Sequence, residues 1–212
     1  MNRSLSILAA ASILLLAACG SNNNDDDAPK VSVTELAAGT YAVSSGDSAN
    51  PTAGTYYAAA DGTRLLVLNN STQQAGTVYR REPNGSWQVT PAVTADTTLE
   101  LLNSSAIPSN VITTGAIARS YTIRLPAGAV AAFSVSAGGD IVAGGTSCKL
   151  SGKLTAATLP NALKLSLTTS GCGDLPAQSD GYLVVDKDYA PAAFRLLTYS
   201  GSAPVDLWAY AE

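Results

Sequence analysis

The sequence predicts an all-β protein: a single antiparallel, meandering β-barrel or β-sandwich of about ten strands with little helix. Two features of residues 31–212 support this prediction. Apolar residues recur at every second position or in short runs, and glycine, proline, asparagine and aspartate separate these segments at short intervals. No long segment has the spacing of an amphipathic helix. The stretch is long enough for one domain with a sizeable core.

Turn-forming residues between strand-like segments predict three hairpins. Asparagine and glycine tolerate the positive φ angles of tight turns, and Asp-Gly is typical of a type I′ turn. The predicted turns are Asp61-Gly62 between 54–60 and 63–68, Pro83-Asn84-Gly85 between 77–81 and 87–90, and Gly138-Gly139 between 130–136 and 141–143.

The second half of the chain alternates more regularly. Leu163, Leu165 and Leu167 alternate with polar residues, so one face of this strand is apolar and the other faces solvent. Residues 148, 150 and 154 also share a face. Further strands are predicted at 181–185, 193–199 and 205–210, and weaker ones at 40–44, 99–102 and 121–125. A single helical turn is expected at 36–38 or 104–110.

The N-terminus has the pattern of an export signal. One positive charge precedes an apolar stretch of 14 residues, Leu5 to Ala18. This stretch is shorter than the roughly 20 residues of a transmembrane helix and typical of a cleaved signal. The tetrad Leu16-Ala17-Ala18-Cys19 resembles the lipobox of bacterial lipoproteins. The resemblance implies that residues 1–18 are removed and that Cys19 carries fatty acyl chains such as palmitate, which anchor it in a bilayer. Gly20, and not aspartate, follows the cysteine, which favours the outer membrane.

Residues 19–30 are predicted to form a lipidated cysteine followed by a disordered spacer. Gly20 to Pro29 contains no large apolar side chain, so it cannot bury enough surface to offset the entropy of ordering. Asp25, Asp26 and Asp27 suggest a metal site, but three adjacent carboxylates on an extended chain cannot all face one ion. We therefore expect a solvated spacer and no metal.

The two remaining cysteines, Cys148 and Cys172, are predicted to form a disulfide, because an exported protein lies in an oxidising compartment. The chain has no histidine, and two cysteines alone do not complete a zinc shell. Opposed residues of an antiparallel ladder point to the same side. In such a ladder the position numbers of every directly opposed pair have the same sum. Pairing Leu154 with 163, 165 or 167 makes this sum odd, whereas 148 and 172 give an even sum, so the cysteines cannot be directly opposed. An offset is therefore predicted at Ser170-Gly171.

The segments around these cysteines carry a second resemblance. Cys148-Lys-Leu-Ser-Gly152 and Ser170-Gly-Cys-Gly-Asp-Leu-Pro176 are similar to segments of small β-rich envelope lipoproteins of Gram-negative bacteria. The resemblance implies a β-barrel-like domain and no particular chemistry.

The residue types present argue against catalysis. The absence of histidine excludes a Ser-His-Asp triad and metal sites that need imidazole. Ser-x-x-Lys does not occur, and Lys149, Lys153 and Lys164 lie on predicted solvent faces. Within residues 31–212, Asp186 and Asp188 form the closest spaced carboxylate pair, but they fall in a predicted turn. We predict no catalytic residues, no cofactor and no enzymatic activity. A carboxylate-based hydrolase is the lesser alternative.

Charge and aromatic residues bear on possible partners. Removal of residues 1–18 takes away one arginine, leaving 11 basic beside 16 acidic residues, which disfavours nucleic acid. Six aromatic residues belong either to the core or to a carbohydrate or peptide groove: Tyr56, Tyr57, Tyr79, Trp87, Trp208 and Tyr210. Arg80 and Arg81 are predicted to lie at a solvated strand end. Three long connections, Ser45–Ala53, Asn69–Ala75 and Asn103–Gly115, are the predicted contact surface.

Together these features predict an outer-membrane-anchored lipoprotein whose domain, residues 31–212, is a non-enzymatic structural or binding module of the cell envelope. Its partners would be the lipid bilayer, through Cys19, and an envelope protein or glycan. The alternative is a periplasmic inhibitor or small-ligand-binding barrel similar to lysozyme inhibitors.

Overall fold

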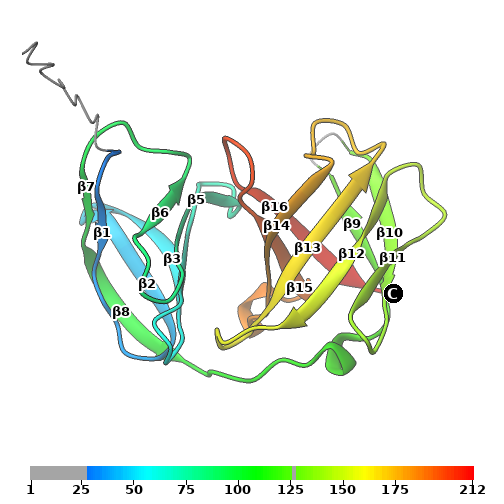
Figure 1. The fold of residues 1–212 in the computed structure, drawn as a ribbon, viewed down its shortest axis with the longest axis horizontal. Helices are drawn as coiled ribbons and strands as arrows, with labels where there is room; N and C mark the ends of the chain where they lie inside the picture. Colours follow the sequence, from blue (N-terminus) through cyan, green and yellow to red (C-terminus); the bar gives the residue numbers. More distant parts are fainter. Residues whose placement is uncertain (1–27, 126–127) are drawn as a thin grey trace, which may run out of the picture.

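A computed structural model describes residues 28–125 and 128–212 of the chain. Across these residues the protein is all-β, with sixteen strands in a closed eight-stranded barrel, a six-stranded sheet and a two-stranded pair. The sheet is built by the first half of the chain and lies beside the barrel, which is built by the second half (Figure 1). The predicted all-β class and an antiparallel, meandering β-barrel are confirmed, but the barrel has eight strands and a separate six-stranded sheet accompanies it, so a single structure of about ten strands is wrong. The signal peptide, Cys19 and the three aspartates at 25–27 lie outside the described residues.

The sheet contains six antiparallel strands in the order β6-β5-β4-β3-β2-β8. A short parallel pair, β1 and β7, lies beside it. The bounds are β1 (Val31–Val33), β2 (Gly39–Asp47), β3 (Asn50–Ala58), β4 (Arg64–Asn69), β5 (Ala75–Arg81), β6 (Gln88–Thr90), β7 (Thr97–Leu99) and β8 (Leu101–Ile107).

The barrel strands follow one another in chain order, and β16 pairs with β9 to close the ring. All eight pairings are antiparallel; seven join strands consecutive in the chain, as hairpin connections require, and the eighth closes the ring. The bounds are β9 (Ser120–Arg124), β10 (Val130–Val135), β11 (Asp140–Ala143), β12 (Lys149–Ala156), β13 (Ala162–Ser170), β14 (Gln178–Val184), β15 (Phe194–Thr198) and β16 (Val205–Ala211).

All three predicted hairpins form, but the first has a different turn. Ala59 N donates to Thr63 O (3.0 Å), and Gly62 N donates to Ala59 O (3.3 Å). Gly62 has a positive φ of 95°, whereas Asp61 does not have a positive φ. The loop therefore has three residues with glycine in the left-handed position, and the predicted type I′ turn is wrong.

The helical turns also lie elsewhere than predicted. Short 3₁₀ helices occupy η1 (Thr114–Ile117) and η2 (Lys187–Tyr189), where the side chains of Thr113 and Asp186 accept hydrogen bonds from backbone N–H groups. Residues 104–107 belong to strand β8, which pairs with β2. Much of the predicted contact loop 45–53 is likewise strand, because β2 and β3 continue to Asp47 and from Asn50. Polar residues misled the prediction here because an exposed hairpin end accepts them on both faces.

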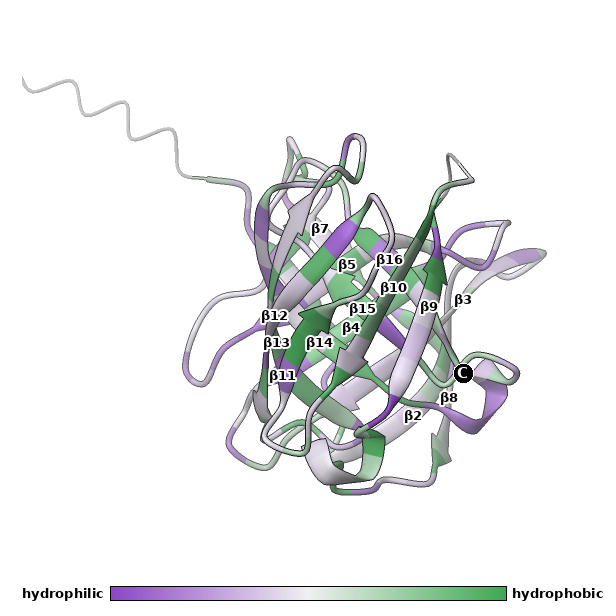
Figure 2. Cartoon of the chain, turned by 90° about the vertical axis from the view of Figure 1, so that its right-hand side faces the viewer, coloured by the Kyte–Doolittle hydropathy of each residue, from purple (hydrophilic) through white to green (hydrophobic). Residues whose placement is uncertain are grey.

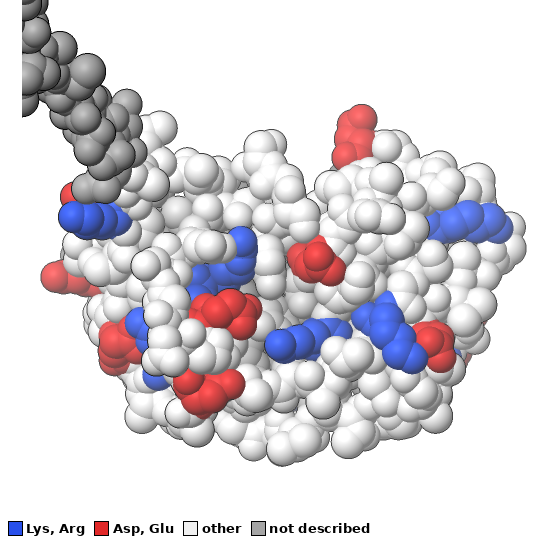
Figure 3. Space-filling view, viewed as in Figure 1, with Lys and Arg blue, Asp and Glu red and all other residues white. Residues whose placement is uncertain are grey.

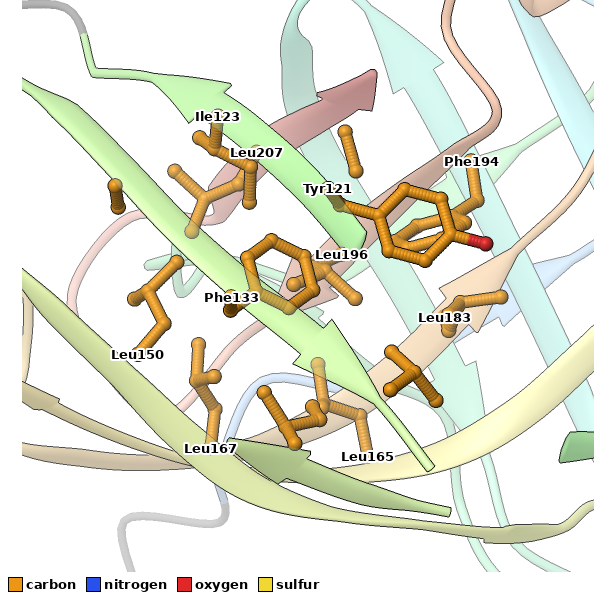
Figure 4. Close-up of a cluster of buried hydrophobic side chains, with 14 of the residues drawn as sticks. Tyr121, Ile123, Phe133, Leu150, Leu165, Leu167, Leu183, Phe194, Leu196 and Leu207 are labelled. Carbon is orange, nitrogen blue, oxygen red and sulfur yellow. The ribbon is translucent and has the colours of Figure 1, made fainter. Parts of the chain in front are cut away.

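Apolar side chains from all eight strands fill the barrel interior (Figure 4). Leu163, Leu165 and Leu167 point inward, as their alternation predicts. Tyr121 packs against the rings of Phe133 and Phe194, with centroids 5.6 and 4.6 Å away. Such aromatic pairs contribute about 0.5–1.5 kcal/mol beyond the area they bury. The interior is therefore a packed core.

The predicted disulfide joins Cys148 and Cys172. The ladder between β12 and β13 pairs Lys149 with Ser170, so Cys172 lies one residue beyond the position opposite Cys148. Gly171 accommodates the offset with a φ of +66°. The prediction of an offset at 170–171 is thus confirmed.

The six-stranded sheet is covered on both faces. Along β4, Leu65 and Val67 pack towards the outer surface of the barrel, whereas Leu66 and Leu68 pack into a second cluster with residues of β1, β6 and β8. Barrel residues that complete the first cluster are Leu159, Ala162, Tyr182, Val184, Tyr189, Ala192 and Leu197. Hydrophobic residues accordingly colour the middle strands β4, β14 and β15 in Figure 2.

Candidate binding site

A buried ion pair lies where the sheet meets the barrel. Arg195 on β15 and Asp206 on β16 are both directed outward from the barrel, and their side chains are only 1% and 3% exposed. Arg195 Nε donates to Asp206 Oδ1 (3.0 Å), and Nη2 donates to Oδ2. Burial by itself opposes the charged guanidinium, but the hydrogen bonds and attraction of Asp206 raise the pKa of Arg195 above its usual range.

The pair also binds two groups of the sheet. Arg195 Nη2 donates to Asn69 Oδ1 (3.2 Å), and Asp206 Oδ2 accepts the backbone N–H of Ala75 (2.7 Å). A buried ion pair needs such additional hydrogen bonds to compensate for the loss of water. Arg195 and Asp206 therefore fasten the start of β5 and the end of β4 to the barrel.

Trp208 lies between two arginines on the outer surface of the barrel. The ladder pairs Arg195 with Trp208 on one side, and its continuation on the other side places Arg124 of β9 next to Trp208. The Arg195 guanidinium carbon lies 4.7 Å from the centroid of the Trp208 ring, a distance at which a cation–π attraction operates. Tyr210 follows two residues later and faces the same way, so β16 presents two aromatic rings to the outside.

The loop between β4 and β5 lies over this row. Asn70 Oδ1 accepts hydrogen bonds from Thr72 N (2.9 Å) and Gln74 N (3.0 Å), which closes the loop on itself. Gln73 has a φ of +63°, a left-handed conformation that a non-glycine residue adopts at a cost. Oriented by its partners, the Gln74 amide donates to Asp206 O (3.1 Å) and accepts from Trp208 Nε1 (3.0 Å). The loop is therefore fixed by its own contacts and by the barrel.

The loop and the barrel surface enclose an open cavity of about 300 Å³, which we call the Trp208 pocket. Its lining combines amides, a hydroxyl, a carboxylate, aromatic rings and a cation: Thr72, Gln73, Gln74, Arg124, Asp206, Trp208 and Tyr210. Within the described part of the chain, Arg124 makes no ion pair and its side chain makes no hydrogen bond. The pocket thus offers one available positive charge beside exposed aromatic surface.

A second groove lies between the sheet and strands β12–β14. This groove, about 330 Å³, is lined by groups of both charges, among them Glu82, Lys153, Lys164 and Asp180. Figure 3 shows basic and acidic side chains beside each other between the two halves of the molecule. Tyr199, at its wall, carries the Arg80 guanidinium at 4.3 Å from its ring centroid. Mixed charges, and the arginine that covers the Tyr199 ring, make this groove the weaker candidate.

The predicted binding residues divide between core and pocket. Tyr56, Tyr57, Tyr79 and Trp87 are buried, whereas Trp208 and Tyr210 line the Trp208 pocket. Of the three predicted contact loops, only Asn69–Ala75 contributes to it. Arg80 and Arg81 are half-buried and stack on Tyr199 and Trp87, so the prediction of a solvated strand end is wrong.

The candidate catalytic groups remain apart from the pocket. Lys149, Lys153 and Lys164 are exposed on the barrel, and Asp186 and Asp188 belong to the turn at η2. Sequence reasoning missed Arg124, whereas Gln73 and Gln74 belong to the predicted contact loop Asn69–Ala75. The period-two pattern of β9 could have placed Arg124 on an outer face, but nothing local indicates that a distant loop covers that face.

Within residues 28–125 and 128–212, no group of three or more Cys, Asp or Glu side chains is arranged to hold a metal ion. In the same residues no helix has the length and apolar character needed to span a membrane. No protein-family model, curated protein or solved structure matches the chain.

Proposed function

We propose that this protein is a lipid-anchored binding module of the bacterial cell envelope and that the Trp208 pocket is its ligand-binding site. The lipobox-like tetrad ending in Cys19 supports acylation and attachment to the outer membrane. The domain then holds an envelope component without converting it. Two features support a non-catalytic role: the chain has no histidine, and the candidate acids and lysines lie outside the Trp208 pocket.

The observation that carries this proposal is the fixed position of loop 70–74 over the outer face of β16. Binding residues are commonly found on loops positioned by a rigid scaffold. Here the loop is held by Asn70 on one side and by Asp206 and Trp208 on the other. A pocket with this lining is formed before the ligand arrives, so little ordering entropy is lost on binding.

The packing of the barrel supports a surface site over an enclosed one. Side chains from every barrel strand fill the interior, including the rings of Tyr121, Phe133 and Phe194. A small ligand could enter only by displacing this core. The packing therefore favours a surface-binding module over the small-ligand-binding barrel considered from the sequence.

Fatty-acid labelling of cells tests the anchor. The wild-type chain should incorporate a labelled palmitate and sediment with outer membranes, and Cys19→Ala should abolish both. Incorporation of label by the Cys19→Ala chain, or an unlabelled wild-type protein, would contradict the lipoprotein assignment.

Co-sedimentation with isolated Gram-negative envelope fragments tests the pocket. The full chain carrying Cys19→Ala should bind the fragments, and addition of Gln73→Ala or Tyr210→Ala should weaken binding several-fold. Val142, 54% exposed on the barrel and outside the pocket, provides the control Val142→Ala. Equal capture by pocket and control variants would move the site elsewhere. Release of soluble fragments that depends on one carboxylate would show an enzyme instead.

A further inference from the structure

We infer that the Trp208 pocket binds a pyranose sugar that carries a carboxylate group. This inference rests on the proposed function and names the chemical class of the ligand. Three features of the pocket support it: an aromatic platform, an available guanidinium and a row of amide groups.

The aromatic platform is formed by Trp208 and Tyr210. Both side chains project from the outer face of β16, and Tyr210 is 39% exposed. The axial C–H groups of a pyranose form a flat apolar surface that packs on such rings, while its hydroxyls remain at the edge. Trp208 is fixed by Arg195 and Gln74, so this ring of the platform is held in place.

The guanidinium of Arg124 provides the charge. It lies beside Trp208 in the ladder, and its side chain makes no ion pair or hydrogen bond within the described residues. The acid in the pocket, Asp206, is already paired with Arg195. A planar guanidinium binds a carboxylate through two parallel hydrogen bonds. A carboxylate on the edge of a stacked sugar would therefore find Arg124 without displacing an existing partner.

The amides supply groups that pair with hydroxyls. The exposed side chain of Gln73 offers a carbonyl oxygen and an NH₂ group, which match the alternating acceptors and donors of neighbouring hydroxyls. A cavity of about 300 Å³ is at the lower end of the range for ligand sites, a size that fits a short saccharide. The chain as a whole has a net charge of −4, so affinity for an anion depends on Arg124 and should fall with salt.

Calorimetry with defined saccharides tests the inference. The probes are a glucuronate-containing tetrasaccharide, the same compound with its carboxylates methyl-esterified, and a neutral glucose tetrasaccharide. The full chain carrying Cys19→Ala should bind the acid at least tenfold more tightly than the ester. Arg124→Gln should abolish this preference. Tyr210→Ala should weaken the binding of the acid and of the ester alike.

Arg119→Gln is the matched control, because Arg119 is exposed and lies outside the pocket lining. This variant should keep the preference for the acid, and unchanged thermal unfolding of both arginine variants should confirm that they fold. Equal affinity for acid and ester, no binding of either, or a preference that survives Arg124→Gln would overturn the inference. If Tyr210→Ala weakens capture of envelope fragments but calorimetry shows no preference for the acid, the proposed function stands and only the ligand class is wrong. If the chain carrying only Cys19→Ala captures no envelope fragments, both the proposed function and this inference are contradicted.

Discussion

At the scale of single residues, the Arg195–Asp206 pair is the most demanding contact, because both charges are removed from water. Asp206→Ala should leave Arg195 charged and unpaired and also remove the acceptor of Ala75 N. We expect a loss of about 3–5 kcal/mol in the free energy of unfolding, measured by urea denaturation. The result would show that the pair holds the sheet on the barrel.

The matched experiment removes both charges. Arg195→Met with Asp206→Leu should recover much of the loss, since an apolar pair often replaces a buried ion pair at little cost. Recovery should be incomplete because Ala75 N remains without a partner. Lys187→Ala, which breaks the exposed pair with Asp188, should change stability by less than about 1 kcal/mol. A small effect of Asp206→Ala would mean that Arg195 finds another partner.

Two glycines beside the disulfide allow the cost of a left-handed backbone to be measured separately from the cost of a steric clash. Gly171 and Gly173 have φ angles of +66° and +65°, but a Cβ at Gly171 would lie 2.8 Å from Ser147 O, whereas one at Gly173 meets nothing within 4 Å. Gly173→Ala should cost about 1–2 kcal/mol for the left-handed conformation alone. Gly171→Ala should cost more. Equal losses in thermal unfolding would show that the segment shifts to relieve the contact.

At the scale of elements, the sequence predicted the hairpins but not how they are layered. Strand β13 alternates leucine with polar residues because only its inner face is buried. Strands β4 and β15 have no such alternation: Leu65 to Leu68 is apolar throughout, and every residue from Phe194 to Thr198 is buried. A continuous apolar run is typical of a strand covered on both faces. This signal indicates a second layer without identifying which strands supply it, so the two-part architecture was missed.

The disulfide was predicted from the two cysteines that remain beside Cys19 and from the export-like pattern of the N-terminus, whereas the parity of strand positions predicted the offset at Ser170-Gly171. Cys148 and Cys172 are separated by 24 residues. Replacing both with alanine should lower the free energy of unfolding by about 3–3.5 kcal/mol, since the bridge restricts the unfolded chain. Wild-type protein treated with a reductant should show the same loss in urea. Unchanged stability after verified reduction would contradict the structural role.

At the scale of the whole molecule, the candidate site depends on contacts between distant segments. The hydrogen bond from Ala75 to Asp206 joins residues 131 positions apart. Sequence patterns report the faces of single strands, so they indicated that loop 69–75, Trp208 and Tyr210 were candidates. They carry no information on the docking of the sheet against β15 and β16, which brings these candidates together. The pocket could therefore be predicted as parts and not as a site.

The same interface makes the molecule sensitive to alkaline pH. Tyr57, Tyr182 and Tyr189 pack between the sheet and the barrel, and Tyr199 lies against them. Burial raises the pKa of all four phenols, and that of Tyr199 rises to about 12. The hydroxyls of Tyr57 and Tyr189 share a hydrogen bond of 3.0 Å, so ionisation of either would place a charge in this interface.

The sign of the pH effect follows from the direction of these shifts. A folded-state pKa above the unfolded value of about 10 means that the unfolded chain loses these protons first. The stabilisation is complete below pH 10 and is lost as pH rises towards 12. Urea midpoints should therefore fall steeply between these values, together with the appearance of tyrosinate absorbance. Tyr199→Phe keeps the ring and removes one ionising group, so its midpoint should fall less. A wild-type midpoint that stays constant to pH 12 would show that these phenols do not control the stability of the fold. An equally steep fall in Tyr199→Phe would show that Tyr199 does not contribute.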